Sequence, residues 1–279
     1  MTRAMLITHT HPETGSGAVA ATSEAAEATG VQLVATADEH AKHGEAAAGI
    51  ERVADGERPD VCIVLGGDGS ILYALRRFAD TGVPVFGVNF GTIGFLAAVE
   101  RDELQDGLRR AFTADFEVME LPALRVQLSV EHPVALNDVS FVRRPHGRMA
   151  ELSYRIGGEE VGNVRCDGLV AATPAGSTGY NLANAGPILA WGVKGYVVSF
   201  IAPHTLAARA LVVAPDDTLH VANPAGRESV EISLDGEGAG ELAPGDELEI
   251  RFEEGVGRLA QLPGANFYHR IREKFGKLA

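Results

Sequence analysis

The sequence predicts an α/β domain with a mostly parallel sheet, followed by a domain rich in β-strands. Three observations lead to this fold class. Up to about residue 115, short apolar runs alternate with stretches of helical periodicity, as in βα units. From residue 116, apolar and polar residues alternate with a period of two, which is typical of antiparallel strands. Residues 266–278 return to helical spacing, so we expect a C-terminal helix that packs back on the first domain.

The expected domains are therefore 1–115 together with 264–279, and 116–263. The formal net charge of −14 argues against sequence-independent binding to nucleic acid. No apolar run is long enough to span a bilayer, and the N-terminal segment turns polar at Thr8, too early for a signal peptide. We therefore expect a cytoplasmic protein with no nucleic-acid or membrane partner.

The first domain opens with a strand at residues 5–8 and a helix over 18–29 that ends at Gly30. A second strand is expected at 31–34 and a short helix within 44–55. These segments supply the first units of the predicted parallel sheet.

The first domain is organised around its next strand and turn. The apolar run at residues 61–65 predicts a strand buried on both faces. The turn Gly66-Gly67-Asp68-Gly69 then permits a sharp reversal before a helix, for which Ser70 is the expected N-cap. Backbone N–H groups in such a turn suit a phosphate, whereas a carboxylate there implies a metal or hydroxyl partner. Three glycines around Asp68 favour a ligand site over an ordinary strand–helix turn.

A second glycine-rich turn follows the next strand. Residues 83–89 predict that strand, residues 89–96 its turn, and residues 101–112 an amphipathic helix. Because ligands of α/β folds bind at the carboxyl ends of parallel strands, we expect the two glycine turns along one edge of the sheet.

In the second domain, period-two strands are expected at residues 116–121, 124–128, 152–156, 230–234 and 248–252. Polar clusters interrupt this pattern at Asn137-Asp138, at Arg165-Cys166-Asp167-Gly168, within 173–181, and at a hairpin turn over 234–237. An amide beside a carboxylate can bind a base edge and a ribose diol, although a simple turn also explains that pair. Residues 173–181 combine hydroxyls with glycines ahead of a short helix at 182–185; a capping loop alone would leave Asp167 and Tyr180 unexplained.

In order and spacing, these motifs resemble those of NAD kinases. The matching stretches are Gly66-Gly67-Asp68-Gly69, Asn137-Asp138, Asp167-Gly168, residues 173–180, residues 203–209, Asp235-Gly236 and residues 266–271. The resemblance covers nearly the whole chain. Gly-Gly-Asp-Gly also occurs in phosphofructokinases and in diacylglycerol or sphingosine kinases, so Thr-Pro-x-Gly-Ser-Thr after Asp-Gly is the discriminating element.

The resemblance implies an enzyme that phosphorylates the 2′-hydroxyl of the adenosine ribose of NAD to give NADP. It implies ATP or inorganic polyphosphate as donor, with Mg²⁺ or another divalent cation, and leaves the metal ligands open. Asp68 is the implied catalytic residue, which accepts or orients the hydroxyl proton. The implied nucleotide-binding residues are Gly67, Gly69, Phe95, Asn137, Asp138, Arg165, Asp167, Thr178, Gly179, Tyr180, Asn181, Ala183 and Glu237. Because sites of this family are completed across a subunit contact, a homodimer or homotetramer is expected.

Four positions depart from the family pattern. Ala175 stands where Thr is frequent, Gly179 where Ala is frequent, and Asp138 where Glu is frequent. Tyr73 stands where many members carry Arg, which leaves the phosphate-donor contacts open. The sequence also leaves open the choice between NAD and NADH and any feedback regulation.

Two other functions stay open. A kinase for a lipid or sugar-phosphate acceptor would share the Gly-Gly-Asp-Gly turn but gives no reason for residues 173–180. A dinucleotide-sensing module without catalysis would not need Asp68, which is present.

Overall fold

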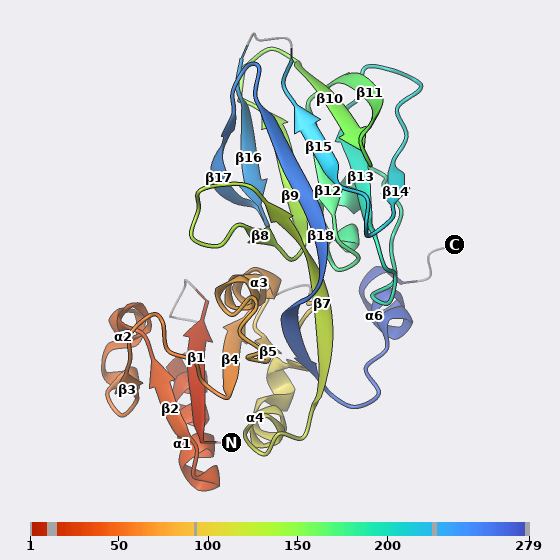
Figure 1. The fold of residues 1–279 in the computed structure, drawn as a ribbon. Helices are drawn as coiled ribbons and strands as arrows, with labels where there is room; N and C mark the ends of the chain where they lie inside the picture. Colours follow the sequence, from red (N-terminus) through yellow and green to blue (C-terminus); the bar gives the residue numbers. More distant parts are fainter. Residues whose placement is uncertain (1, 10–15, 92–93, 225–227, 277–279) are drawn as a thin grey trace. The chain divides into compact units, whose positions relative to one another are not determined.

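The computed structural model describes residues 2–9, 16–91, 94–224 and 228–276 (Figure 1). The chain divides into two compact units, Met1–Glu120 with Gly257–Ala279, and Leu121–Val256. The predicted fold class is confirmed, because the first unit is α/β and the second consists mainly of strands. The boundaries between the units fall inside strands β7 (Glu117–Val126) and β18 (Glu247–Gln261). Part of each of these two strands therefore belongs to the first unit.

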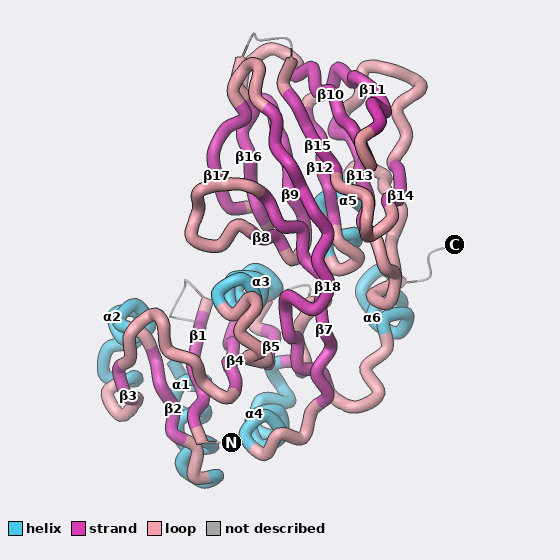
Figure 2. Tube along the Cα trace, in the orientation of Figure 1, coloured by secondary structure: helices cyan, strands magenta, loops and turns pink. Residues whose placement is uncertain are grey.

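The sheet of the first unit is parallel. Its strands lie in the order β3 (Glu51–Arg52), β2 (Gln32–Ala35), β1 (Arg3–Thr8), β4 (Val61–Gly66) and β5 (Val85–Asn89), and β5 also pairs with β6 (Val99–Glu100) and with Leu259 of β18. The helices of this unit are α1 (Ser16–Thr29), α2 (Ala37–His43), α3 (Asp68–Arg77), α4 (Leu104–Phe112) and α6 (Phe267–Phe275), with 3-10 turns η2 (Gly44–Ala47) and η3 (Arg101–Glu103) (Figure 2). Every residue of β4 is buried, as the apolar run predicts, including the free thiol of Cys62.

Three helix predictions differ in detail from the structure. The short helix expected within 44–55 is the 3-10 turn η2, which covers only Gly44–Ala47. The chain also forms α2 just before it, whose acidic first turn and basic last turn complement the helix dipole. Ser70 is not an N-cap, because α3 already begins at Asp68 and Gly67 occupies the cap position. The short helix expected at 182–185 is α5 (Tyr180–Ala183), preceded by η4 (Gly176–Thr178).

The C-terminal helix packs within the first unit, as predicted. The Asn266 side chain caps α6 by accepting hydrogen bonds from the backbone N–H groups of Tyr268 and His269. Ile271 is buried, and the ring of Phe275 lies 5.3 Å from that of Phe95, centroid to centroid. Phe275 is nevertheless 37 % exposed, so Ile271 is the main apolar anchor of this helix.

Shortening that anchor should destabilise the first unit. We expect Ile271→Ala to lower the free energy of unfolding by about 2–5 kcal/mol, the range for emptying a buried aliphatic site. Urea denaturation measures this change. Tyr268→Ala is the matched control, since Tyr268 lies on the same helix and is 70 % exposed. Equal stability of the two variants would contradict the packing described here.

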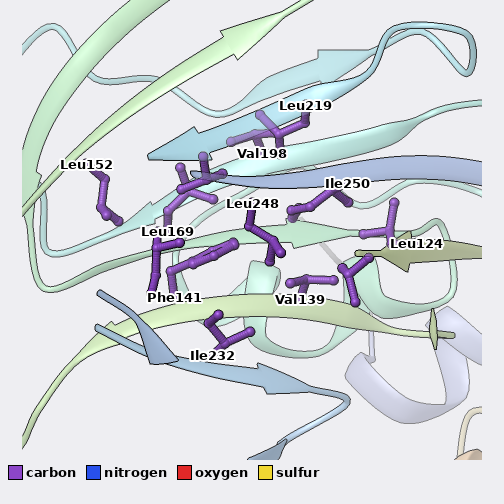
Figure 3. Packing of buried hydrophobic residues seen from close by; sticks show 14 of the residues in the cluster. Leu124, Val139, Phe141, Leu152, Leu169, Val198, Leu219, Ile232, Leu248 and Ile250 are labelled. Atoms are coloured by element: carbon purple, nitrogen blue, oxygen red, sulfur yellow. The ribbon is translucent and has the colours of Figure 1, made fainter. Parts of the chain in front are cut away.

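The second unit is a sandwich of two sheets. One contains β11 (Glu159–Cys166), β10 (Ala150–Ile156), β15 (Leu219–Ala222) and β18, with β7 and β8 (Val134–Ala135) beside them. The other has the order β14 (Leu211–Val213), β13 (Tyr196–Ile201), β12 (Gly168–Ala172), β9 (Asp138–Arg143), β16 (Val230–Leu234) and β17 (Glu237–Leu242). Both sheets contribute to one apolar core, in which Phe141 and Leu169 meet Leu219 and Ile250 (Figure 3). Across the described ranges, no helix combines the length and the apolar character needed to cross a membrane.

Candidate functional site

In the first unit, the two glycine turns meet at the carboxyl ends of β4 and β5. Phe90 N–H donates to the carbonyl of Gly66 at 3.0 Å, which joins the turns through their backbones. The Asp68 carboxylate binds the second turn as well: Oδ2 accepts from Phe95 N–H at 2.8 Å, and Oδ1 accepts from Leu96 N–H at 3.1 Å. The expected placement of both turns on one sheet edge is therefore confirmed.

The ionisation of Asp68 is set by opposing influences. Burial raises the pKa of its carboxyl, whereas the N–H groups of Phe95 and Leu96, and then the charges of Arg270 and Lys274, lower it; the net shift is upward. A carboxylate with a raised pKa is a stronger base than an ordinary aspartate. Asp68 thus combines a fixed position with increased basicity.

The residues around Asp68 differ in their exposure to solvent. Gly67 is partly buried and Gly69 is exposed, both at the N-terminal end of the ten-residue helix α3. Such a helix end favours anions through its free N–H groups and dipole. Phe95 is buried, so its backbone rather than its ring faces Asp68. Tyr73 projects from α3 and is 44 % exposed.

In the second unit, one carboxylate shapes the Asn137-Asp138 motif. Asp235 lies in the turn between β16 and β17, where it and Gly236 adopt φ values of 51° and 82°. Its Oδ1 accepts from Asn137 N–H at 2.7 Å and from Asp138 N–H at 3.1 Å, and its Oδ2 accepts from Leu136 N–H at 3.0 Å. The hairpin turn is as predicted, but its acidic residue points back and holds the motif.

Asp138 is itself buried, with 7 % of its surface exposed. Burial, and then the charge of Asp235, raise the pKa of Asp138 to about 7. Its carboxyl therefore changes charge near neutral pH, unlike that of an ordinary aspartate. When ionised, it can accept two hydroxyl protons.

The segment 173–180 packs directly on this motif. Thr173 Oγ1 donates to the carbonyl of Leu136 at 2.6 Å, and Thr173 N–H donates to the carbonyl of Asn137 at 2.8 Å. A Cβ at Gly176 would lie 2.0 Å from the Asn137 carbonyl oxygen, so a larger residue cannot fit there. The discriminating motif thus supports the backbone of Asn137-Asp138.

The hydroxyls of this segment are used mainly inside the protein. Ser177 is buried and donates to the carbonyl of Pro174 at 2.7 Å. Thr178 is half-buried and donates to the carbonyl of Ala175 at 3.2 Å. Asn181 is buried and donates to the carbonyls of Ser177 and Pro187, so its side chain holds the loop.

The side chains that surround Asp138 come from the same segment. A Cβ at Gly179 would lie 4.0 Å from Asp138 Oδ2, an ordinary van der Waals distance, so Gly179 lies directly beside the carboxyl. Tyr180 is 37 % exposed, and burial followed by the charges of Asp138 and Asp167 raises the pKa of its hydroxyl. Gly179 therefore lies beside Asp138, and the charges of both Asp138 and Asp167 act on Tyr180.

Other predicted residues of the second unit are exposed or half-buried. Arg165, Ala183 and Glu237 occupy exposed positions on β11, α5 and β17. Asp167 follows β11 and accepts from Arg143 Nε at 2.6 Å. Among the described residues, the Oδ1 atom of Asn137 is one of several buried side-chain atoms that have no hydrogen-bond partner in the protein.

The same described ranges contain no group of three or more His, Cys, Asp or Glu side chains placed to hold a metal ion.

Known families match both parts of the chain. The family models for the ATP-NAD kinase N-terminal domain and the ATP-NAD kinase C-terminal domain match residues 18–116 and 136–257. A curated NAD kinase of Rhodopirellula baltica is 36 % identical over 222 residues, which cover 78 % of this chain and 71 % of that protein. One from Symbiobacterium thermophilum is 37 % identical over 220 residues, covering 77 % and 78 %.

Solved structures show the same fold. Yeast NADH kinase complexed with NADH superposes with a TM-score of 0.86 at 20 % identity, covering 100 % of this chain and 89 % of that one. An NAD kinase from Archaeoglobus fulgidus in complex with ATP gives a TM-score of 0.76 at 24 % identity, with coverages of 99 % and 98 %.

Proposed function

Because the chain belongs to the NAD kinase family, we propose that it phosphorylates the 2′-hydroxyl of the adenosine ribose of NAD, forming NADP. One observation carries the choice of acceptor. The segment 173–180 packs on Asn137-Asp138, with Gly179 directly beside the Asp138 carboxyl. A carboxylate in this setting suits the hydroxyls of a ribose, whereas a lipid acceptor would give it no role.

We propose that Asp68 is the catalytic base. Its carboxylate is held by two backbone N–H groups and keeps further acceptor capacity, so it can take the proton of the 2′-hydroxyl as the phosphoryl group arrives. Phosphoryl transfer has a loose transition state, so most of the rate acceleration must come from positioning and charge stabilisation. The raised pKa of Asp68 supports this role.

For the dinucleotide, we propose the following contacts. Asn137 and Asp138 would bind ribose hydroxyls, and Asp167, Thr178, Gly179 and Tyr180 would surround the adenine and the far end of NAD. Phe95, Arg165, Asn181, Ala183 and Glu237 complete the proposed set; for Asn181, its role inside the loop supports an indirect contribution.

For the phosphate donor, we propose the N-terminal end of α3 with Gly67 and Gly69, and either ATP or polyphosphate. A divalent cation such as Mg²⁺ would reach the site on the donor's phosphates, where it neutralises their charge.

We also propose a cytoplasmic homodimer or homotetramer. Leu211 and Val212 on the edge strand β14 are 42 % and 50 % exposed, and an exposed apolar edge strand favours pairing with another chain. Light scattering of the purified protein measures the assembly, and a monomer at micromolar concentration would refute it.

The direct test is NADP formation by the purified protein with NAD, Mg²⁺ and either ATP or polyphosphate. NADP is expected with at least one donor. NADH, diacylglycerol and fructose 6-phosphate serve as parallel acceptors, since a lipid or sugar kinase would phosphorylate one of the last two instead. Folded protein that forms no NADP with either donor would overturn the proposed function.

A further inference from the structure

Residues 95–97, here termed the support loop, hold Asp68 on one side and are themselves held on the other. The N–H groups of Phe95 and Leu96 donate to the Asp68 carboxylate. Arg270 Nη1 donates to the carbonyl of Phe95 at 2.8 Å and to that of Ala97 at 2.7 Å. One guanidinium nitrogen therefore binds both ends of the loop.

The middle of the support loop is bound from the same side. Gln261 Nε2 donates to the carbonyl of Leu96 at 2.8 Å, and Gln261 Oε1 accepts from Arg270 Nη2. Leu96 and Ala97 are buried, so these carbonyls need partners within the protein. Arg270 and Gln261 thus supply those partners to all three carbonyls of the loop.

Charge connects the same groups. Arg270 and Lys274, both on α6, lower the pKa of Asp68 against the larger effect of its burial. Burial lowers the pKa of Arg270, while Asp68, Glu100 and Glu273 raise it. Lys274 is itself bound to Glu100, with Nζ 3.1 Å from Oε1. Arg270 is therefore the cation that combines contact with the loop and an effect on Asp68.

We propose that Arg270 is a positioning residue for the phosphoryl transfer, because it holds the loop whose N–H groups orient the Asp68 carboxylate toward the 2′-hydroxyl. This inference rests on the proposed function. Arg270 acts through the backbone of the support loop, not on the substrate. A planar guanidinium suits this task, since its several N–H donors diverge in a fixed geometry.

The test compares Arg270→Gln and Arg270→Lys with wild type. For Arg270→Gln we expect kcat to fall roughly 10- to 100-fold, the scale of a small misplacement of a catalytic group, with KM for NAD within about twofold. The substitution also removes a positive charge that lowers the pKa of Asp68, so the acid limb of the kcat–pH profile should move to higher pH. Arg270→Lys keeps the charge, so its limb should stay in place while kcat falls.

Arg272→Gln is the matched control. Arg272 is an exposed arginine on the same helix, and its contact is with His269 rather than with the loop. We expect its kcat and pH profile to match those of wild type within about twofold.

Amide hydrogen exchange at Phe95 and Leu96 provides a readout independent of activity. Exchange should accelerate about tenfold or more in Arg270→Gln and stay unchanged in Arg272→Gln.

Two kinetic results would overturn the inference and leave the proposed function standing, provided that wild type forms NADP. In the first, Arg270→Gln keeps the kcat of wild type. In the second, its kcat falls but the acid limb of its kcat–pH profile does not move. If wild type forms no NADP, the proposed function fails, and unchanged exchange would then overturn the inference as well. Should Arg270→Gln not fold, a wild-type kcat in Arg270→Lys overturns it.

Discussion

Replacing Asp68 by Asn is expected to lower kcat for NADP formation by roughly 10²–10⁴, the range for losing a general base. The substitution keeps the size of the side chain and removes the charge and the basic oxygen. KM for NAD should change little, because the proposed ribose and base contacts come from residues of the second unit. Wild-type activity should fall as pH decreases through the pKa of Asp68, since the protonated carboxyl cannot accept the hydroxyl proton, and the variant should lack this limb.

The structure adds a second effect that must be measured on the same preparation. Asp68 also accepts hydrogen bonds from Phe95 and Leu96, and Asn offers a single acceptor oxygen, so one N–H group loses its partner at a cost of about 1–3 kcal/mol, while removal of a buried charge offsets part of this cost. Thermal unfolding and kcat per folded molecule separate the two effects. Asp106→Asn, at an exposed carboxylate on α4, is the control for loss of charge in the same unit. A folded Asp68→Asn variant with unchanged kcat would remove Asp68 from the mechanism.

Asp138→Asn should stabilise the protein at alkaline pH. The folded-state pKa of about 7 lies above the ordinary value of 3.8, so the folded state binds more protons than the unfolded state between these values. This group therefore lowers the free energy of unfolding as pH rises from about 4 to 7. The full penalty above pH 7 is at most about 4 kcal/mol, at 1.36 kcal/mol per pKa unit. An asparagine side chain cannot ionise and avoids this penalty.

Thermal unfolding of Asp138→Asn at pH 5 and pH 8 measures the effect. The gain in Tm over wild type should be several degrees at pH 8 and roughly half as large or less at pH 5. Asp246→Asn, at an exposed carboxyl of the same unit, should show no such increase with pH. An equal Tm difference at both pH values would contradict a buried carboxyl that titrates near neutrality.

The same variant should bind NAD less well. The amide that replaces the carboxylate keeps one acceptor oxygen in place of two, so KM for NAD should rise roughly 5- to 100-fold, with a smaller change in kcat. In wild type, KM should also rise as pH falls below about 7, where Asp138 gains its proton. A KM that is constant across this range would exclude Asp138 as an acceptor for the ribose.

Local patterns in the sequence were sufficient to predict the parts of the site that depend on neighbouring residues. The buried strand β4, the Gly66–Gly69 turn and the hairpin at Asp235-Gly236 all follow from residues close together in the chain. The contacts that orient the acidic groups were not predictable in this way. Asp235 is separated from Asn137 by 98 residues, and Arg270 from Phe95 by 175.

Local chemistry also misled at two points. Ser70 looked like an N-cap because Ser is favoured there, but the chain enters α3 at Asp68, whose carboxylate binds the next turn. Residues 234–237 were expected to form a hairpin turn, but turn residues alone do not predict that Asp235 binds the backbone N–H groups of Leu136, Asn137 and Asp138. In both cases an acidic side chain is occupied by backbone donors from a distant segment.

The first unit contains residues from both ends of the described chain, which has a consequence for synthesis. The second unit is one continuous stretch, Leu121–Val256, whereas the first also needs Gly257–Ala279. A ribosome delivers residue 120 long before Leu259 can pair with Val85 or Arg270 can reach Phe95. The unit that starts first is therefore completed after the second unit, and the contacts that hold Asp68 are complete only once Arg270 has been synthesised.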